Sequence, residues 1–155
     1  MACWLMKTEP DAFSLDDLQR SPAQTAPWDG VRNYQARNYL RDQMQVGDDV
    51  FIYHSSCAQP GIVGMAEVVR AGYPDDSAWN PAAPAYDPRS TPENPRWYRV
   101  DVRYTGRFRT PITLAVMKQM PELAQFILLR PGLRLSVMPV PEDVRDHLLA
   151  RYPRV

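Results

Sequence analysis

The segment from Trp28 to Asn33 concentrates groups that can recognise a ligand. The indole of Trp28 can stack on a nucleic-acid base, and the carboxylate of Asp29 can accept a hydrogen bond from the amino group of that base. Gly30 permits a tight turn, and Asn33 can cap a helix whose free N–H groups, with Arg32 beside them, would attract an anion. Because Asp29 would repel a phosphate, the segment fits a base-binding site better than a plain anion site. The alternative is a turn with a core tryptophan and a capping asparagine.

The run His54-Ser55-Ser56 raises the question of a hydrolase. On a strand, His54 and Ser56 would share a face, but a nucleophilic serine also needs an orienting acid and an oxyanion hole, and the Gly-x-Ser-x-Gly motif is absent. The three polar side chains could instead satisfy loop amides at a strand end, or line a ligand pocket. We favour the pocket, because aromatic side chains alternate with polar and basic ones at the ends of other predicted elements. No catalytic residue is therefore assigned.

Three further positions complete the set of polar and aromatic candidates. Lys7 follows an apolar strand and could reach a phosphate, although a lysine at a strand end is usually only solvated. Trp97 lies opposite the core-facing side chains of an alternating strand, so it is an exposed aromatic, a residue covered by the preceding loop, or a pocket wall. Ser136, between two apolar neighbours, is interpreted as part of the core.

The elements that would position these residues follow from periodicity and capping signals. We expect strands over residues 3–7, 50–54, 61–69, 97–104, 108–112 and 133–137, and short helices over 15–20, 34–44 and 113–119, from 121 and from 141. A glycine inside a strand, Gly64, indicates a bulge or a close backbone approach. Strict strand–helix–strand alternation is missing, so the pattern favours a small, strongly bent sheet or barrel with helices outside it.

Length and composition are those of one globular domain, residues 1–155, with 45% hydrophobic and 23% charged residues. Six of the 16 prolines fall between Tyr73 and Arg96, which predicts one long surface loop. No apolar run could cross a membrane, and the N-terminus resembles no signal peptide, so we expect a cytoplasmic protein. Cys3 and Cys57 should be free and buried. Zinc-site spacings and the glycine-rich nucleotide motifs are absent, which argues against metal and cofactor chemistry.

Charge is balanced over the chain but unevenly spread. Residues 1–95 carry 7 Lys and Arg against 13 Asp and Glu, whereas residues 96–155 carry 11 against 5. The basic part could meet an anionic partner, or the two parts could interleave in the fold so that their charges mix.

Seven motifs, in order along nearly the whole chain, resemble those of the EVE domain family of thymocyte nuclear protein-type sequences. They are Trp4–Pro10, Trp28–Asn38, Tyr53–Ser56, Gly61–Gly64, Tyr73–Asp75, Asn94–Trp97 and Leu135–Val137. Thr8 stands where we would expect serine, which keeps the hydroxyl.

The resemblance implies an α+β fold of the PUA-like superfamily, a small bent β-barrel of five or six mostly antiparallel strands with short flanking helices. This fold is similar to that of YTH domains, which hold a methylated base in an aromatic cage, and EVE domains are regarded as readers of modified bases in DNA or RNA. The family implies no metal and no cofactor. It assigns base binding to Lys7, Thr8, Trp28, Asp29, Gly30, Val31, Arg32, Asn33, His54, Ser55, Ser56 and Trp97, and phosphate contacts to Lys7, Arg32 and Arg96.

We therefore expect a non-catalytic module that binds a modified base, flipped out or single-stranded, in DNA or RNA. Because the net charge is zero, affinity for unmodified duplex should be weak. Two alternatives stay open: an enzyme acting on nucleic acid, a nuclease or base hydrolase that uses His54 or Asp29, and a domain for a small nucleoside-like metabolite. The particular base, the polymer and the oligomeric state are also open at this point.

Overall fold

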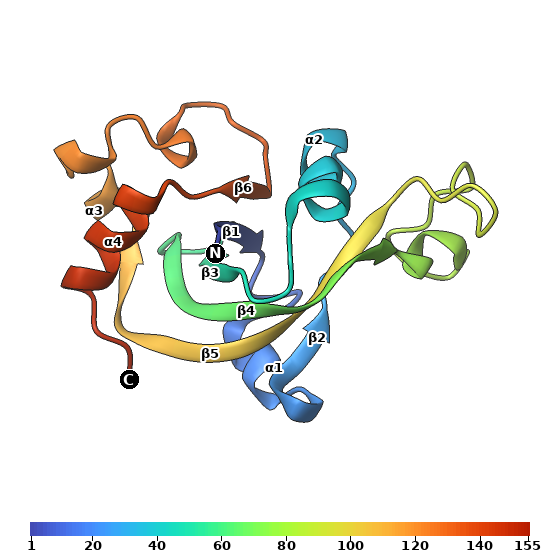
Figure 1. The fold of residues 1–155 in the computed structure, drawn as a ribbon, viewed down its shortest axis with the longest axis horizontal. Coiled ribbons are helices and arrows are strands. Elements are labelled where there is room, and N and C mark those ends of the chain that lie inside the picture. Colours follow the sequence, from blue (N-terminus) through green and yellow to red (C-terminus); the bar gives the residue numbers. More distant parts are fainter.

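A strongly bent sheet of six strands forms the centre of the molecule in the computed structural model, which describes residues 1–155 (Figure 1). The strands are β1 (Cys3–Thr8), β2 (Thr25–Pro27), β3 (Asp49–His54), β4 (Gly61–Pro74), β5 (Tyr98–Thr113) and β6 (Val137–Pro139). Their order is β2-β5-β4-β3-β1-β6; the β1–β3 pair is parallel and the other four pairs are antiparallel. The expected mostly antiparallel α+β fold is confirmed, with the sheet left open between the edge strands β2 and β6.

Short helices flank this sheet, as expected. They are α1 (Leu15–Arg20), α2 (Tyr34–Asn38), α3 (Leu114–Met117) and α4 (Glu142–Arg151), and α2 continues into a π-helical turn over Tyr39–Gln43. The predicted caps are confirmed. Ser14 and Asp17 form a reciprocal capping box at α1, and the side chain of Asn33 accepts a hydrogen bond from the Ala36 N–H at α2.

The long strands β4 and β5 exceed their predicted lengths because bulges interrupt their pairing without ending it. The separate strand expected over 108–112 is part of β5. Gly64 marks a close approach: a Cβ atom there would lie 2.5 Å from both the Gly106 carbonyl oxygen and a methyl of Leu15. A side chain at this position would therefore push α1 away from the sheet.

Three expectations about the remaining elements were wrong. The helix expected from Pro121 is two 3₁₀ turns, Pro121–Leu123 and Ile127–Leu129, because the buried residues Leu123, Phe126 and Leu128 are spaced too irregularly for one helical face. The strand expected over 133–137 starts only at Val137, since pairing with β1 ends there. Strand β2 was missed, because three residues ending in proline give no periodic signal.

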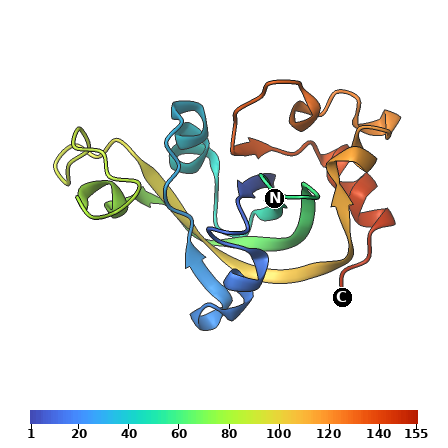
Figure 2. The same cartoon turned by 180° about the vertical axis from the view of Figure 1, so that it is seen from behind.

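The two ends of the sheet carry different structures. Figures 1 and 2 show α3 and α4 gathered at one end, while the segment between β4 and β5 projects from the other. That segment matches the predicted long loop, with one 3₁₀ turn at Asp76–Trp79. Cys3 and Cys57 are both free; Cys3 is buried and Cys57 half-buried. None of the helices combines the length and apolar character that a membrane span requires.

Candidate functional site

A cavity of about 600 Å³, here called the Trp28 cavity, lies between the segment that joins β1 to α1 and the segment that joins β2 to α2. In the rear view of Figure 2, the blue chain leading from β2 to α2 passes in front of the long β4–β5 ribbon. The lining residues are Lys7, Thr8, Glu9, Ala12, Phe13, Ala26, Pro27, Trp28, Asp29, Gly30, Val31, Arg32 and Ser136. The volume falls within the range of small-ligand sites, roughly 300–1,000 Å³.

Trp28 forms the aromatic wall of this cavity. Its side chain packs against Phe13 with the rings edge to face, centroids 6.1 Å apart, and its backbone N–H donates to the Val100 carbonyl oxygen at 2.8 Å. The indole N–H groups of Trp28 and Trp79 have no acceptor within the chain, whereas those of Trp4 and Trp97 donate to Asp48 and Asp87. Since Trp28 is only 7% exposed, the ring is fixed by packing while one edge keeps an unused donor.

Asp29 supplies an acceptor at the mouth of the same cavity. Its side chain is 49% exposed, and the nearest cation is Arg99, whose guanidinium lies 3.8 Å from the carboxylate. Burial, together with the negative charge of Asp75, raises the pKa of Asp29 above its ordinary value, and Arg99 opposes that rise. The carboxylate is thus placed to accept a hydrogen bond from a bound group and is not consumed by a close ion pair.

The wall from Gly30 to Arg32 is fastened by Asp75, a fully buried carboxylate. Asp75 accepts hydrogen bonds from the Gly30 N–H at 2.9 Å, the Arg32 guanidinium at 3.0 Å and the Ser77 hydroxyl at 2.6 Å. Burial alone would raise the pKa of Asp75, but the hydrogen bonds from Ser77, Gly30 and Arg32 outweigh it and lower the pKa. Gly30 adopts φ +80, a conformation that favours glycine. Asp75 therefore joins the long loop to the cavity wall.

Arg32 is a structural brace in this arrangement. All five guanidinium N–H groups are engaged, two with the Ala85 carbonyl oxygen and one each with Val31, Asp75 and Ser77. Arg32 therefore has no unused N–H donor for the phosphate contact that we expected of it, because its hydrogen bonds tie the cavity wall to the loop.

Lys7 is the expected phosphate contact that does line the Trp28 cavity. Its ammonium lies 5.6 Å from the centre of the Tyr53 ring and forms no ion pair, and burial lowers its pKa. A half-buried ammonium without a counter-ion would gain from an incoming anion.

A second hollow of about 530 Å³, the Ser55 cavity, adjoins the first one and shares four lining residues with it, Lys7, Thr8, Glu9 and Ser136. Ser55, Ser56 and Arg134 complete the polar part of its wall. Ser56 holds φ 53, an uncommon conformation for serine, at the end of β3. Hydroxyl groups and two cations thus line the space beside the Trp28 cavity.

His54 lies outside both hollows and holds α1 against the sheet. Its Nε2 atom accepts a hydrogen bond from the Leu15 N–H at 3.1 Å, and burial lowers its pKa. Because the lone pair of Nε2 already accepts this bond, it is not available as a general base.

Three other expected ligand-binding residues also lie away from the Trp28 cavity. Trp97 is covered by the long loop, with its ring 4.9 Å from that of Tyr34. Asn33 caps α2, and Arg96 contacts the Tyr34 hydroxyl at 3.3 Å. The structure brings together Lys7, Thr8, Trp28, Asp29, Gly30, Val31 and Arg32.

Sequence reasoning missed Phe13, Ser136 and Asp75. Ser136 was interpreted as core, and Asp75 was seen only as the start of the loop; both fall within motifs shared with the family, and that was the signal available. No group of three or more His, Cys, Asp or Glu side chains is placed to hold a metal ion.

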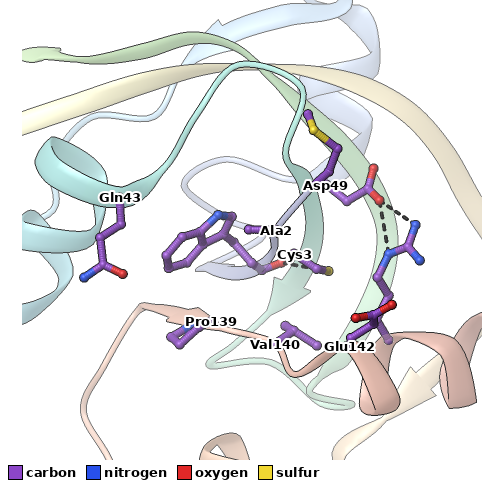
Figure 3. A pocket seen from close by; sticks show the side chains of 10 residues that line it. Ala2, Cys3, Gln43, Asp49, Pro139, Val140 and Glu142 are labelled. Carbon is purple, nitrogen blue, oxygen red and sulfur yellow. Dashed lines mark hydrogen bonds and ion pairs between the residues drawn. The ribbon is translucent and has the colours of Figure 1, made fainter.

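A cavity of about 580 Å³ at the other end of β1, the Cys3 cavity, provides an internal comparison (Figure 3). The Asp49 carboxylate in its wall is joined to the Arg145 guanidinium at 2.7 and 3.1 Å. Burial and the charge of Asp49 raise the pKa of the Cys3 thiol to about 12, so the thiol stays protonated.

Comparison with known proteins agrees with this architecture. A model of the EVE domain family matches residues 2–151. Thymocyte nuclear protein 1 of Homo sapiens is 39% identical over 163 residues, which cover 95% of this chain and 72% of that protein. A crystal structure of a protein from Pseudomonas syringae has a TM-score of 0.91 and 46% identity, covering 96% of this chain and 98% of that one. The crystal structure of human THYN1 protein in complex with 5-methylcytosine-containing DNA has a TM-score of 0.91 and 38% identity, covering 97% and 96% of the two chains.

The bent open sheet with short flanking helices is the fold of a PUA-like domain. The match along nearly its whole length is specific: the chain belongs to the EVE domain family.

Proposed function

We propose that this domain binds a modified base of nucleic acid in the Trp28 cavity, as a binding module and not as an enzyme. The observation that carries the proposal is the cavity wall itself: a fixed indole with an unused N–H, next to a carboxylate that can accept a hydrogen bond. A base offers the matching set, a flat ring and an edge of donors and acceptors.

5-Methylcytosine in DNA is the first candidate ligand. A relative with 38% identity and a TM-score of 0.91 has been crystallised with DNA that contains this base. The amino group of cytosine can donate to Asp29, and the methyl group adds apolar surface that can pack against the cavity wall. Since a base within a duplex is stacked, we expect binding to favour single strands or an extruded base.

The enzyme alternative loses its proposed base, since His54 Nε2 accepts a backbone hydrogen bond. Asp29 forms no side-chain hydrogen bond with a nucleophile or a second acid, and its ion-pair partner is Arg99 at 3.8 Å. A recognition role accounts for both residues: His54 stabilises the fold and Asp29 contacts the ligand.

A thermal-shift panel tests the proposal. Short single-stranded DNA and RNA would be compared, unmodified and with 5-methylcytosine, 5-hydroxymethylcytosine or N6-methyladenine. A ligand at about 100 times its Kd should stabilise the domain by roughly 2.7 kcal/mol. We expect the largest shift for 5-methylcytosine DNA.

The matched variants are Asp29→Asn and, as a control, Asp143→Asn on the exposed face of α4. Asp29→Asn should reduce the shift, whereas Asp143→Asn should leave it unchanged. Equal shifts for modified and unmodified strands, or none with any oligonucleotide, would contradict the proposal.

A further inference from the structure

Lys7 is the meeting point of three hollows. Besides the Trp28 and Ser55 cavities, it lines a third one of about 600 Å³, the Arg130 cavity, whose other cations are Lys118 and Arg130. The remaining wall is largely apolar and includes Leu114 of α3, Leu128 and Leu129 of the second 3₁₀ turn, and Leu133 from the segment that follows it. Lys7 is therefore a lining residue common to all three cavities.

The cations of this region have no internal counter-ions. Lys7, Lys118, Arg130 and Arg134 form no ion pairs, although eight arginines elsewhere do. Glu9 is the single carboxylate that lines the Ser55 cavity, and the Arg130 cavity has none. An excess of unpaired positive charge beside a base-sized cavity is the electrostatic pattern expected for phosphates.

The chemistry of the walls changes along this path. Hydroxyls and cations surround the Ser55 cavity, and such groups commonly contact phosphate and sugar oxygens. The Arg130 cavity combines cations with leucine side chains, which suits a nucleotide with one charged and one flat apolar side. A free nucleoside would use the first cavity alone, whereas a strand could use all three.

We propose that a nucleic-acid strand follows this path: its modified base enters the Trp28 cavity, the adjoining phosphodiester lies in the Ser55 cavity near Lys7 and Arg134, and the neighbouring nucleotide occupies the Arg130 cavity. The inference rests on the proposed function and extends it from a base to a strand. The chain draws these cations from both parts of its sequence, because β1 pairs with β6 and brings Lys7 beside the segment that precedes β6.

The test is the salt dependence of binding for a short single-stranded DNA with one 5-methylcytosine, and for its unmethylated counterpart. Each lost phosphate contact should flatten the slope of log K against log salt concentration by about 0.7. Arg130→Ala and Arg134→Ala should each flatten the slope and weaken binding of both strands equally, by about fivefold. Both arginines are exposed, so the variants should keep the fold, which thermal unfolding would verify.

Arg109→Ala is the matched control, since this exposed arginine of β5 forms no ion pair and lines none of the three cavities. Slopes of Arg130→Ala and Arg134→Ala equal to that of Arg109→Ala would overturn the strand path. The preference of the unaltered protein for methylated over unmethylated strand is a separate readout: its absence would contradict the proposed function, whatever the slopes show.

Discussion

The Trp28 and Cys3 cavities have almost the same volume, about 600 and 580 Å³, and adjoin opposite ends of strand β1. They differ in the pairing of one indole N–H and one charged side chain in each, although not in every polar group: Arg32 of the Trp28 cavity is fully engaged, and Gln43 and Glu142 of the Cys3 cavity form no side-chain hydrogen bond or ion pair. In the Cys3 cavity Asp49 is paired with Arg145, and the indole N–H of Trp4 donates to Asp48. In the Trp28 cavity the indole N–H of Trp28 has no acceptor within the chain, and the ammonium of Lys7, which lies 5.6 Å from the centre of the Tyr53 ring, forms no ion pair.

Volume alone does not mark a binding site. Closed ion pairs and hydrogen bonds must be broken before a ligand can use the groups that form them, and breaking them costs desolvation and pairing energy. Fixed groups without partners can bind at no such cost. This contrast supports the proposal that the Trp28 cavity holds the ligand, whereas the Cys3 cavity lies where β1, β6 and α4 meet (Figure 3).

The largest expected effect comes from two buried carboxylates, one near each cavity. Asp75→Asn and Asp48→Asn should each lower the free energy of unfolding by about 3 kcal/mol, because each removes a buried charge that accepts several hydrogen bonds. Only Asp75→Asn should also weaken base binding, since Asp75 holds Gly30 and Arg32 in place. Denaturant unfolding would measure the stability of each variant, and titrations below both melting temperatures would measure base binding. Equal losses of binding in the two variants would contradict the different roles given to the two cavities.

Next in size is a pair of tryptophan substitutions. Trp4→Phe removes the donor to the buried Asp48 and should cost about 1–3 kcal/mol of stability, with no effect on ligand affinity. Trp28→Phe breaks no hydrogen bond within the chain, so its stability cost should be smaller, but it removes the donor offered to the base. Affinity should fall about tenfold, which corresponds to roughly 1.4 kcal/mol. Titration calorimetry with a 5-methylcytosine oligonucleotide would compare the affinities of the two variants. A loss of affinity in Trp4→Phe would count against the Trp28 cavity as the base-binding site.

The smallest effect concerns pH. Burial lowers the pKa of His54 in the folded state, so the unfolded chain binds more protons near pH 6.5 and below. Stability should therefore fall on acidification from about pH 7 to 5, by less than about 1.4 kcal/mol per pH unit. His54→Gln, whose amide oxygen can still accept the Leu15 N–H, should reduce this dependence. An unchanged pH profile in His54→Gln would show that another group causes it.

Much of the fold could be predicted from local patterns. Strict alternation marked the first half of β5, β-branched and aromatic residues marked β3, and Gly64 signalled a close approach that the structure confirms. The failures have a common origin, in that local signals were absent or misleading. Strand β2 was too short to show a period, and the alternation over 133–137 reflects burial of Leu135 and Val137 without strand pairing.

The candidate site was predictable where its residues are adjacent in sequence, as they are from Trp28 to Arg32. It was not predictable where a partner comes from far along the chain. Asp75 lies 45 residues from Gly30, and Arg32 lies 53 from Ala85, yet these contacts decide that Arg32 is a brace. Residue type alone cannot tell a free guanidinium from one whose donors are all used.

The most direct test of the central claim is an NMR titration that follows the indole N–H signals of the four tryptophans, assigned with single Trp→Phe variants. A single-stranded DNA with one 5-methylcytosine would be added, with the unmethylated strand as control. We expect the methylated strand to shift the Trp28 signal most, while the signal of Trp4, whose indole N–H donates to Asp48, stays in place. A shift of Trp4 with Trp28 unmoved, or identical responses to both strands, would contradict this expectation.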